Sequence, residues 1–371
     1  MTTIFTRRDA LRMAVGGAGA LVAGAGLAGR ASAADTTMRQ VGLPFLWPDK
    51  GLYGLAATAA DSVWIAGVQG ELTVPGPIPG TGKTVGGNPV VRRWTGSAWK
   101  EYPINGWSNN GPMLSVAALS SSEVWVTGYR RVSDTESQPF IARFSGTAFE
   151  AVAAPQGVVV SFRQLPRVKA MPGGLFLEAW VDAGRLFRRN GDSWAAYPTT
   201  GLQAIDVYYA RTADDVWLIG EGDTSGVPLA RRWNGTAWQS VPLPALDSAN
   251  AYVSDIVAPS ANDAWIAGTS EPAGGGTPFL WHWNGSAWSR TNPGPDGFHR
   301  DAQGTFWGTQ HTTGTPNVVS IHKYDGTSWQ PTGNTMTAPG VYSVGSLTMV
   351  PTTRAFWGLG SGSDLKVFTT Q

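Results

Sequence analysis

The chain has 371 residues, 42% of them apolar and 14% charged, which excludes an intrinsically disordered protein and allows one large β domain or two ordinary domains. Its formal net charge is only +1, and no basic cluster follows the first 33 residues, which argues against nucleic acid as the main partner. The absence of cysteine excludes disulfides, thiolate nucleophiles and Cys-ligated metal centres.

Residues 1–33 are predicted to be a signal peptide. The paired Arg7-Arg8 resembles the twin-arginine export signal, residues 13–29 form an apolar run, and Ala31-Ser32-Ala33 has the small residues of a cleavage site. The alternative is a membrane anchor, for which the run is shorter than the roughly 20 residues required. We expect a secreted, extracellular protein, exported folded through the twin-arginine route, that contacts the membrane only transiently. Cleavage or retention of the leader stays open.

A two-part pattern recurs from residue 38 onward. Its first half is an apolar run that ends in glycine, as in Val216–Gly220, and its second half contains a tight turn, as in Arg231–Trp238. The first-half anchors are aromatic and are separated by 41 to 61 residues: Trp64, Trp125, Phe176, Trp217, Trp265, Phe306 and Phe356. The second-half turns contain Gly96, Gly146, Gly191, Gly235, Gly285 and Gly326. Steps of this size are typical of four-stranded propeller blades.

The repeat predicts an all-β fold, a seven-bladed β-propeller of four-stranded blades that forms a single domain over residues 38–371. The seventh unit stops at Phe368, before its fourth strand. Residues 38–44 are therefore expected to supply an N-terminal strand that closes the ring and removes exposed sheet edges. The repeated aromatic side chains are predicted to pack between adjacent blades.

The runs Val63–Gly67 and Arg232–Trp238 resemble repeats of secreted bacterial propellers related to kelch and galactose-oxidase central domains. The likeness is at the level of the fold and covers nearly all of the chain after the leader. The chain lacks the kelch glycine doublet, the Asp-box spacing of sialidase-like propellers and the cysteine of the galactose-oxidase copper site. The resemblance implies a propeller fold and no particular activity.

The two ends of the predicted propeller differ in their connections. The turns between first and second and between third and fourth strands are short and similar; we call this end the turn face. The other connections vary, and this end, the loop face, is expected to bind the ligand. Its longest connection, Gln69–Asn88, is either a lid or a disordered insertion. Trp47 and Trp107 lie outside repeat positions, and each either stacks on a ligand or anchors its own loop.

Charged residues interrupt several of the inner strands that should line a central channel. The candidate ligand-binding residues are Arg163 and Arg167, which share one parity with Lys169, then Asp206, Asp255, Arg300 and Asp301. Charges in such a place need water, a partner or a ligand, because isolated burial is prohibitive. Two interpretations stay open: a ring of compensating ion pairs in a wet channel, or a polar ligand site.

His299, beside an arginine and close to two aspartates, is the candidate proton-transfer group. No metal site or cofactor is predicted, because the four histidines form no ligand-spaced pair and no cofactor fingerprint is present. Two functions stay open. The first is a monomeric binding propeller for a small molecule, glycan or protein. The second is a cofactor-independent enzyme, a lyase or cyclase acting on a specialised metabolite in the channel.

Overall fold

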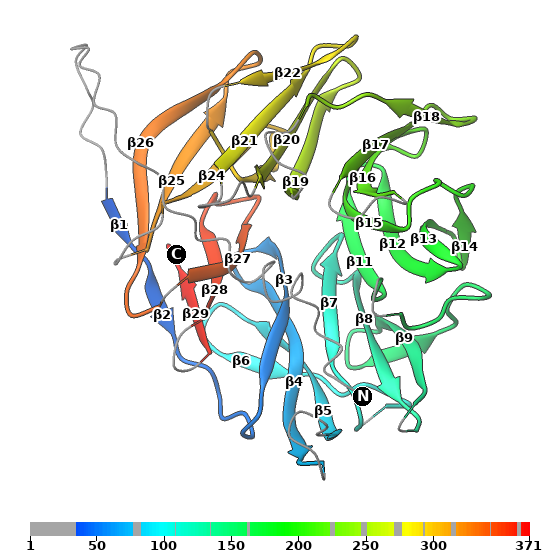
Figure 1. Ribbon diagram of the computed structural model, residues 1–371. Helices are drawn as coiled ribbons and strands as arrows, with labels where there is room; N and C mark the ends of the chain where they lie inside the picture. The colour runs from blue at the N-terminus through cyan, green and yellow to red at the C-terminus, as the bar shows by residue number, and fades with distance from the viewer. Residues whose placement is uncertain are drawn as a thin grey trace.

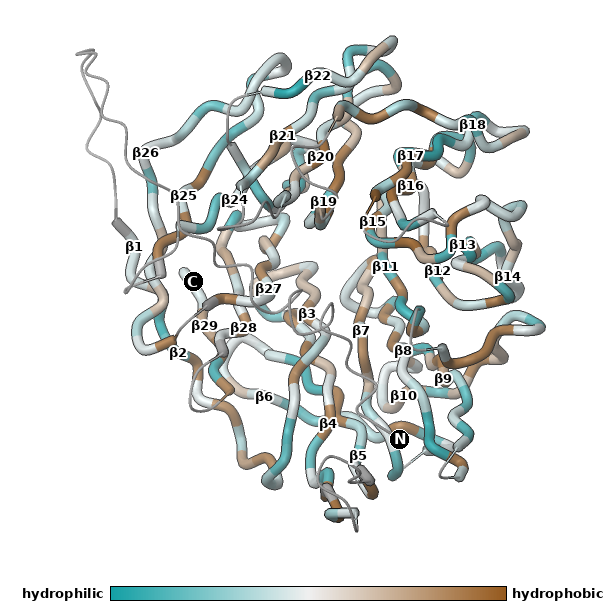
Figure 2. Tube along the Cα trace, in the orientation of Figure 1, coloured by the Kyte–Doolittle hydropathy of each residue, from teal (hydrophilic) through white to brown (hydrophobic). Residues whose placement is uncertain are grey.

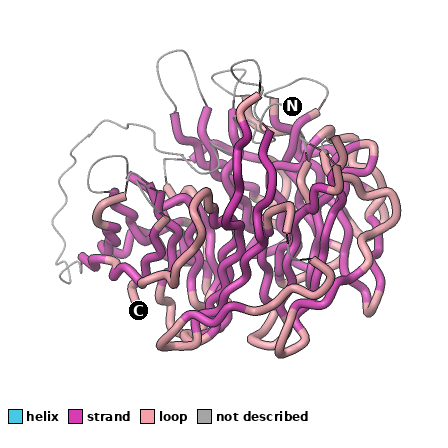
Figure 3. The backbone as a smooth tube through the Cα atoms, turned by 90° about the horizontal axis from the view of Figure 1, so that it is seen from below, coloured by secondary structure: helices cyan, strands magenta, loops and turns pink. Residues whose placement is uncertain are grey.

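The computed structural model describes residues 35–76, 83–107, 109–133, 135–161, 164–222, 227–245, 251–270, 277–291, 294–312, 317–341, 343–361 and 365–371. Within these ranges the chain forms β-strands and turns, and no helix is long and apolar enough to cross a membrane. The strands form seven sheets around one axis (Figure 1) and run between the two faces of the disc (Figure 3). The predicted seven-bladed all-β propeller is confirmed.

In each blade the strands follow one another from the channel outward. Blade 1 contains β3 (Gly51–Ala59), β4 (Ser62–Val74), β5 (Lys83–Trp94) and β6 (Trp99–Glu101). Blade 2 contains β7 (Met113–Ala118), β8 (Val124–Arg131), β9 (Ser137–Phe144) and β10 (Phe149–Val152). Blade 3 contains β11 (Arg167–Met171), β12 (Gly174–Val181), β13 (Ala183–Asn190) and β14 (Ser193–Ala196). Blade 4 contains β15 (Ala204–Thr212), β16 (Asp215–Glu221), β17 (Pro228–Trp233) and β18 (Trp238–Val241).

Blades 5 to 7 follow the same order. Blade 5 contains β19 (Ala251–Ser260), β20 (Asp263–Ser270), β21 (Thr277–Trp283) and β22 (Trp288–Thr291). Blade 6 contains β23 (Gly297–Arg300), β24 (Phe306–Thr312), β25 (Asn317–Tyr324) and β26 (Trp329–Ala338). Blade 7 contains β27 (Ser343–Met349), β28 (Phe356–Ser361) and β29 (Lys366–Thr369) and is completed by β2 (Arg39–Val41).

The ring is closed by the N-terminal segment 35–41, here called the clasp. β2 pairs antiparallel with β29, as the sequence predicted, and β1 (Asp35–Thr37) adds an unexpected parallel fifth strand to blade 6 by pairing with β26. Met38 joins the two strands; its side chain is only 1% exposed, and its N–H donates to Thr337 O at 2.8 Å. The clasp therefore holds two neighbouring blades together through one extended segment.

The repeated aromatic side chains fill the space between blades. Trp217 of blade 4 is fully buried, and its ring centroid lies 5.4 and 5.3 Å from Trp283 and Trp288 of blade 5. Trp357 packs in the same way on Trp94 and Trp99 of blade 1, at 5.7 and 5.9 Å. Each such ring contributes several kcal/mol, about 3–5 kcal/mol by truncation to Ala.

Strand register corrects two of the predicted anchors. Trp307 pairs with Lys323 across β24 and β25, as Trp217 pairs with Arg232 in blade 4, so Trp307 is the anchor of blade 6. Trp357 is likewise the anchor of blade 7. Phe306 and Phe356 were wrong by one residue, which places a side chain on the opposite face of its strand.

The glycine that ends each apolar run has a structural reason. Five inner strands carry a β-bulge at one level, opposite Gly67, Gly128, Gly220, Gly268 and Gly360. A Cβ atom on Gly220 would lie 2.0 Å from Ala204 O, the carbonyl that the bulge brings close. β11 and β23 begin to pair opposite Glu178 and Thr309, one residue past this level, and their blades carry Ala179 and Gln310 at the glycine position. The extra residues at the five bulges, Tyr53, Leu114, Asp206, Ser254 and Gly345, all line the cavity.

Candidate functional site

The seven inner strands enclose a central cavity of about 890 Å³, a volume in the range of small-molecule sites. Each inner strand enters from the loop face and runs toward the turn face, so the bulge level lies nearest the loop-face mouth. The cavity is therefore a site built on strands of a closed scaffold, with variable connections around its mouth.

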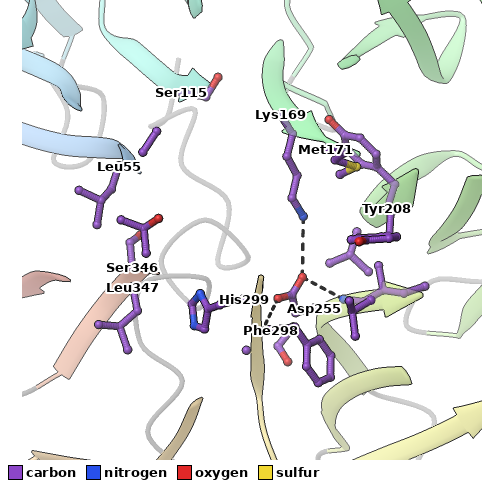
Figure 4. Close-up of a pocket in the computed structure, with 18 of the residues that line it drawn as sticks. Leu55, Ser115, Lys169, Met171, Tyr208, Asp255, Phe298, His299, Ser346 and Leu347 are labelled. Carbon is purple, nitrogen blue, oxygen red and sulfur yellow. Dashed lines mark hydrogen bonds and ion pairs between the residues drawn. The ribbon is translucent and has the colours of Figure 1, made fainter. Parts of the chain in front are cut away.

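The cavity has two chemically different walls (Figure 4). Among the described lining residues, β27, β3 and β7 supply no charged side chain; they supply Leu55, Ala56, Ser115, Ser346 and Leu347, here called the smooth wall. The opposite side, here called the polar wall, comes from β11, β15, β19 and β23 and their neighbours and contains Arg167, Lys169, Asp206, Asp255, Asp296 and His299.

One ion pair on the polar wall joins blades 3 and 5. Lys169 Nζ lies 3.8 Å from Asp255 Oδ1 and 5.7 Å from the Tyr208 ring centroid. Asp255 has a second, structural role, because Oδ1 accepts from its neighbour Ile256 N and Oδ2 accepts from Phe298 N of blade 6, both at 2.9 Å. Asp255 thus ties two inner strands together and also faces the cavity.

Blade 6 contributes a carboxylate–imidazole pair. His311 Nδ1 lies 2.8 Å from Asp296 Oδ1, and His311 N donates to Asp296 Oδ2 at 2.8 Å. Burial by itself would lower the pKa of His311, but the hydrogen bond to Asp296 and the carboxylate charge outweigh it and raise that pKa, with a smaller contribution from the backbone of Val344. The His311 imidazole in this pair is therefore protonated more readily than an isolated histidine.

His299 lies beside that pair and is held differently. Its Nε2 is 3.2 Å from Thr309 Oγ1, and its ring packs edge-on against Phe356 with centroids 5.2 Å apart. Burial, and to a lesser extent the charge of nearby His311, lower the pKa of His299 to about 4. The side chain is consequently neutral near pH 7 and can accept a proton from a group in the cavity.

Several predicted site residues do line the channel. Arg167, Asp206 and Arg300 border the cavity, the first two of them engaged with protein partners. Arg300 stacks on Phe306, its guanidinium carbon 5.6 Å from the ring centroid. Arg163 lies outside the described residues.

Asp301, which the sequence suggested as a ligand-binding residue, has both carboxylate oxygens hydrogen-bonded within a turn. Its Oδ1 accepts from the backbone N–H of Gln303 and Thr305, and its Oδ2 accepts from Trp307 and Arg354. These hydrogen bonds outweigh the effect of burial and lower the pKa of Asp301. Asp301 follows the end of β23 and therefore lies at the turn face. Both of its carboxylate oxygens already accept hydrogen bonds there.

The two loop tryptophans have different surroundings. Trp107 is 4% exposed and packs on Phe140 with centroids 4.7 Å apart, so it anchors its own loop and does not offer a stacking surface. Trp47 is 60% exposed and lies edge-on to Phe45, which is 72% exposed. Of these two tryptophans, only Trp47 has an indole ring that is accessible to a ligand.

The long connection 69–88 extends the sheet where it is described. β4 and β5 continue as a paired hairpin up to Val74 and Lys83, and residues 77–82 lie outside the described residues. Arg131 of blade 2 holds the base of this hairpin through Glu71 at 2.7 Å and Gly86 O at 3.1 Å. The described part therefore stands as a braced extension of blade 1, which neither the lid nor the disordered alternative anticipated.

Exposed apolar side chains concentrate on the loop face. Seven of the eight large apolar side chains that are exposed in the described part of the chain lie there: Phe45, Trp47, Leu72, Val74, Val132, Val159 and Val227. Leu119 is on the turn face. This distribution agrees with the expectation that the loop face contacts other molecules.

Sequence reasoning missed the tyrosines of the polar wall. The Tyr208 hydroxyl is buried without a hydrogen-bond partner among the described residues, and burial raises the pKa of Tyr209 to about 12. The signal was present in the sequence: both lie on an inner strand two and three residues after Asp206. The described residues contain no cluster of three or more His, Asp or Glu side chains that could hold a metal ion.

No family model matches the sequence, and a search of curated proteins gives no match. Among solved structures, the chain is similar to YCF48 bound to D1 peptide (12% identity, TM-score 0.52, 87% of this chain and 93% of that one). It is also similar to the GH74 xyloglucanase of Xanthomonas campestris (14% identity, TM-score 0.51, 88% of this chain and 54% of that one). The kelch and galactose-oxidase relationship is not confirmed. At these identities the comparisons establish that the chain shares the β-propeller fold.

Proposed function

We propose that this protein is an exported binding propeller that holds a small amphipathic molecule in its central channel, entered from the loop face. The observation that carries the proposal is the two-walled cavity of about 890 Å³. A site with one smooth, largely apolar wall and one hydrogen-bonding wall suits a ligand with an apolar face and a polar edge, such as a saccharide or a specialised metabolite. Trp47 offers a stacking ring at the loop face.

A channel-filling variant tests this proposal. Ser346 faces the cavity from the smooth wall (Figure 4), so Ser346→Trp should occupy the space a ligand needs. Oligosaccharides and amphipathic metabolites are screened by thermal melting, because a ligand at 100 times its Kd stabilises the folded state by about 2.7 kcal/mol. A true ligand should stabilise the parent and the turn-face control Leu119→Trp. Equal stabilisation of Ser346→Trp would contradict binding in the channel.

Export is part of the proposal and rests on Arg7-Arg8 and the apolar run behind them. These residues lie outside the described ranges. Replacing both arginines by lysine should leave the precursor inside the cell. Unchanged secretion of the double variant would exclude the twin-arginine route.

A cofactor-independent enzyme is the second candidate, favoured by the Asp296–His311 pair beside a neutral His299 on one cavity wall. Two imidazoles whose environments shift their pKa values in opposite directions can supply a base and an acid. Turnover of candidate metabolites should then be lost in His299→Ala and in His311→Ala. His282→Gln, a blade 5 framework variant, is the control. Turnover that persists in both alanine variants would leave binding as the function.

A further inference from the structure

The Lys169 ammonium is only weakly paired with the described residues of the channel. Its contacts with described residues are Asp255 Oδ1 at 3.8 Å, which is longer than a hydrogen bond, and the face of Tyr208. The Lys169 side chain is 45% exposed. An exposed ion pair of this length is weak, so Asp255 does not immobilise the ammonium.

Asp255 does not depend on Lys169 in return. Both of its oxygens accept backbone N–H groups, one of them from the next blade. Ser115 of blade 2 likewise connects neighbouring inner strands, because its Oγ accepts a hydrogen bond from Val168 N of blade 3 at 2.9 Å. The position of Asp255 is thus explained by strand pairing, and Lys169, which lines the cavity, reaches toward Asp255 without being required there (Figure 4).

The cavity lining around Lys169 carries charges of both signs. Arg167, Glu178 and Asp206 belong to it and are already engaged with other groups of the protein. Asp296 pairs with His311. Arg300 forms no ion pair with a described residue, and its guanidinium lies over the Phe306 ring. Lys169 and Arg300 are therefore the cavity-lining cations whose charge is at most weakly paired within the described residues.

The described residues of the wall opposite Lys169 include no charged side chain. Leu55, Leu347, Ser115 and Ser346 line the cavity there (Figure 4). A molecule long enough to span the cavity from Lys169 lies against these leucines. Apolar contact on one side and an unsatisfied ammonium on the other select for a ligand that combines an apolar body with an acidic group.

We propose that the channel ligand is an amphipathic anion, whose carboxylate, sulfonate or phosphate group binds Lys169 while its apolar body packs on Leu55 and Leu347. The inference rests on the proposed channel-binding function and names the chemistry of its ligand. Lys169 acts here as the residue that selects a charged ligand over a neutral one of the same shape.

Two fluorescent probes that share an apolar body test this inference. 8-Anilinonaphthalene-1-sulfonate carries a sulfonate, and N-phenyl-1-naphthylamine lacks it. Titration of the folded parent should show one site that prefers the sulfonate probe. Lys169→Met should weaken the sulfonate probe about tenfold or more and leave the neutral probe within about twofold, since about 1.4 kcal/mol corresponds to tenfold. Lys169→Arg keeps the positive charge and should bind the sulfonate probe nearly as tightly as the parent does.

Lys323→Met is the matched control, because Lys323 lies on β25 over Trp307 and does not line the cavity. Equal loss in Lys323→Met, or no change in Lys169→Met while Ser346→Trp blocks both probes, would overturn the anion assignment and leave channel binding intact. Binding of both probes that Ser346→Trp does not alter would instead contradict the channel as the site, and with it the proposed function. Near-ultraviolet circular dichroism of each variant verifies that the tryptophan packing is native.

Discussion

Blades 3 and 6 differ from the other five in one backbone feature: their inner strands, β11 and β23, begin to pair only one residue past the bulge level. Where the other blades have glycine opposite the bulge, these two have Ala179 and Gln310. The same two blades supply most of the Arg, Lys, Asp, Glu and His residues that line the channel: Arg167, Lys169, Glu178, Asp296, His299, Arg300 and His311. A departure from the repeat at the glycine position therefore coincides with the chemistry of the channel, as expected where function overrides a structural rule.

The comparison also shows what the two kinds of blade share. Both pack an aromatic anchor against the next blade, Trp217 in blade 4 and Phe176 in blade 3, and both rings are fully buried. The outer parts of the blades therefore provide stability in the same way, and only the inner strands differ. This separation can be tested by variants that address one part at a time.

The largest effect is expected at the anchors. Trp217→Ala and Phe176→Ala should each lower the free energy of unfolding by about 3–5 kcal/mol, because each leaves a cavity between blades. Trp47→Ala, on the loop face, should change it by no more than about 0.5 kcal/mol. Chemical denaturation measures all three. A much smaller cost for Phe176→Ala would show that blade 3 is not packed like the bulged blades.

The next effect concerns the clasp, which joins blade 6 to blade 7. Met38→Ala should cost about 2–5 kcal/mol, because its side chain is 1% exposed within the packing of both blades. Gln40→Ala, an exposed change on β2, is the control. Thermal melting measures both variants. A melting temperature of Met38→Ala equal to that of the parent would show that other contacts close the ring.

A smaller effect should come from the glycine rule itself. Gly220→Ala should destabilise by about 1–3 kcal/mol, because the new methyl group meets Ala204 O and forces the bulge to shift. The reciprocal change at the same repeat position of blade 3, Ala179→Gly, should cost about 0.5–1 kcal/mol. Thermal melts of the pair decide the matter. A Gly220→Ala variant as stable as the parent would remove the link between glycine and bulge.

The smallest effect is a pair of opposite pH dependences in blade 6. The folded pKa of His299 is about 4, below the ordinary 6.5, so its contribution to stability is lost as pH falls from about 6.5 to 4. The folded pKa of His311 is raised, so its contribution is complete below about 6.5 and is lost as pH rises through the folded pKa. His299→Gln should flatten the melting temperature on the acidic side, and His311→Gln on the alkaline side. Parallel profiles for both variants would contradict this assignment.

The sequence by itself determined the number of blades and the closure of the ring. Both follow from local patterns: apolar runs with aromatic anchors, and tight turns whose glycines have positive φ, from 54° at Gly191 to 102° at Gly326. It also placed His299, Arg167, Asp206 and Asp255 on inner strands, because the position of a residue within the repeat fixes its radius from the axis. The register was ambiguous only where two aromatic residues are adjacent, as at Phe306 and Trp307.

Only the tertiary structure decided which of these residues meet. Lys169 and Asp255 come from different blades, and the two walls of the cavity exist only once all seven inner strands surround one axis. The burial of Trp107 and the use of Asp301 in a turn depend on neighbours that no local pattern encodes. The physical reason is that strand patterns report local backbone geometry, whereas solvation and charge pairing in the channel depend on residues brought together from distant parts of the chain.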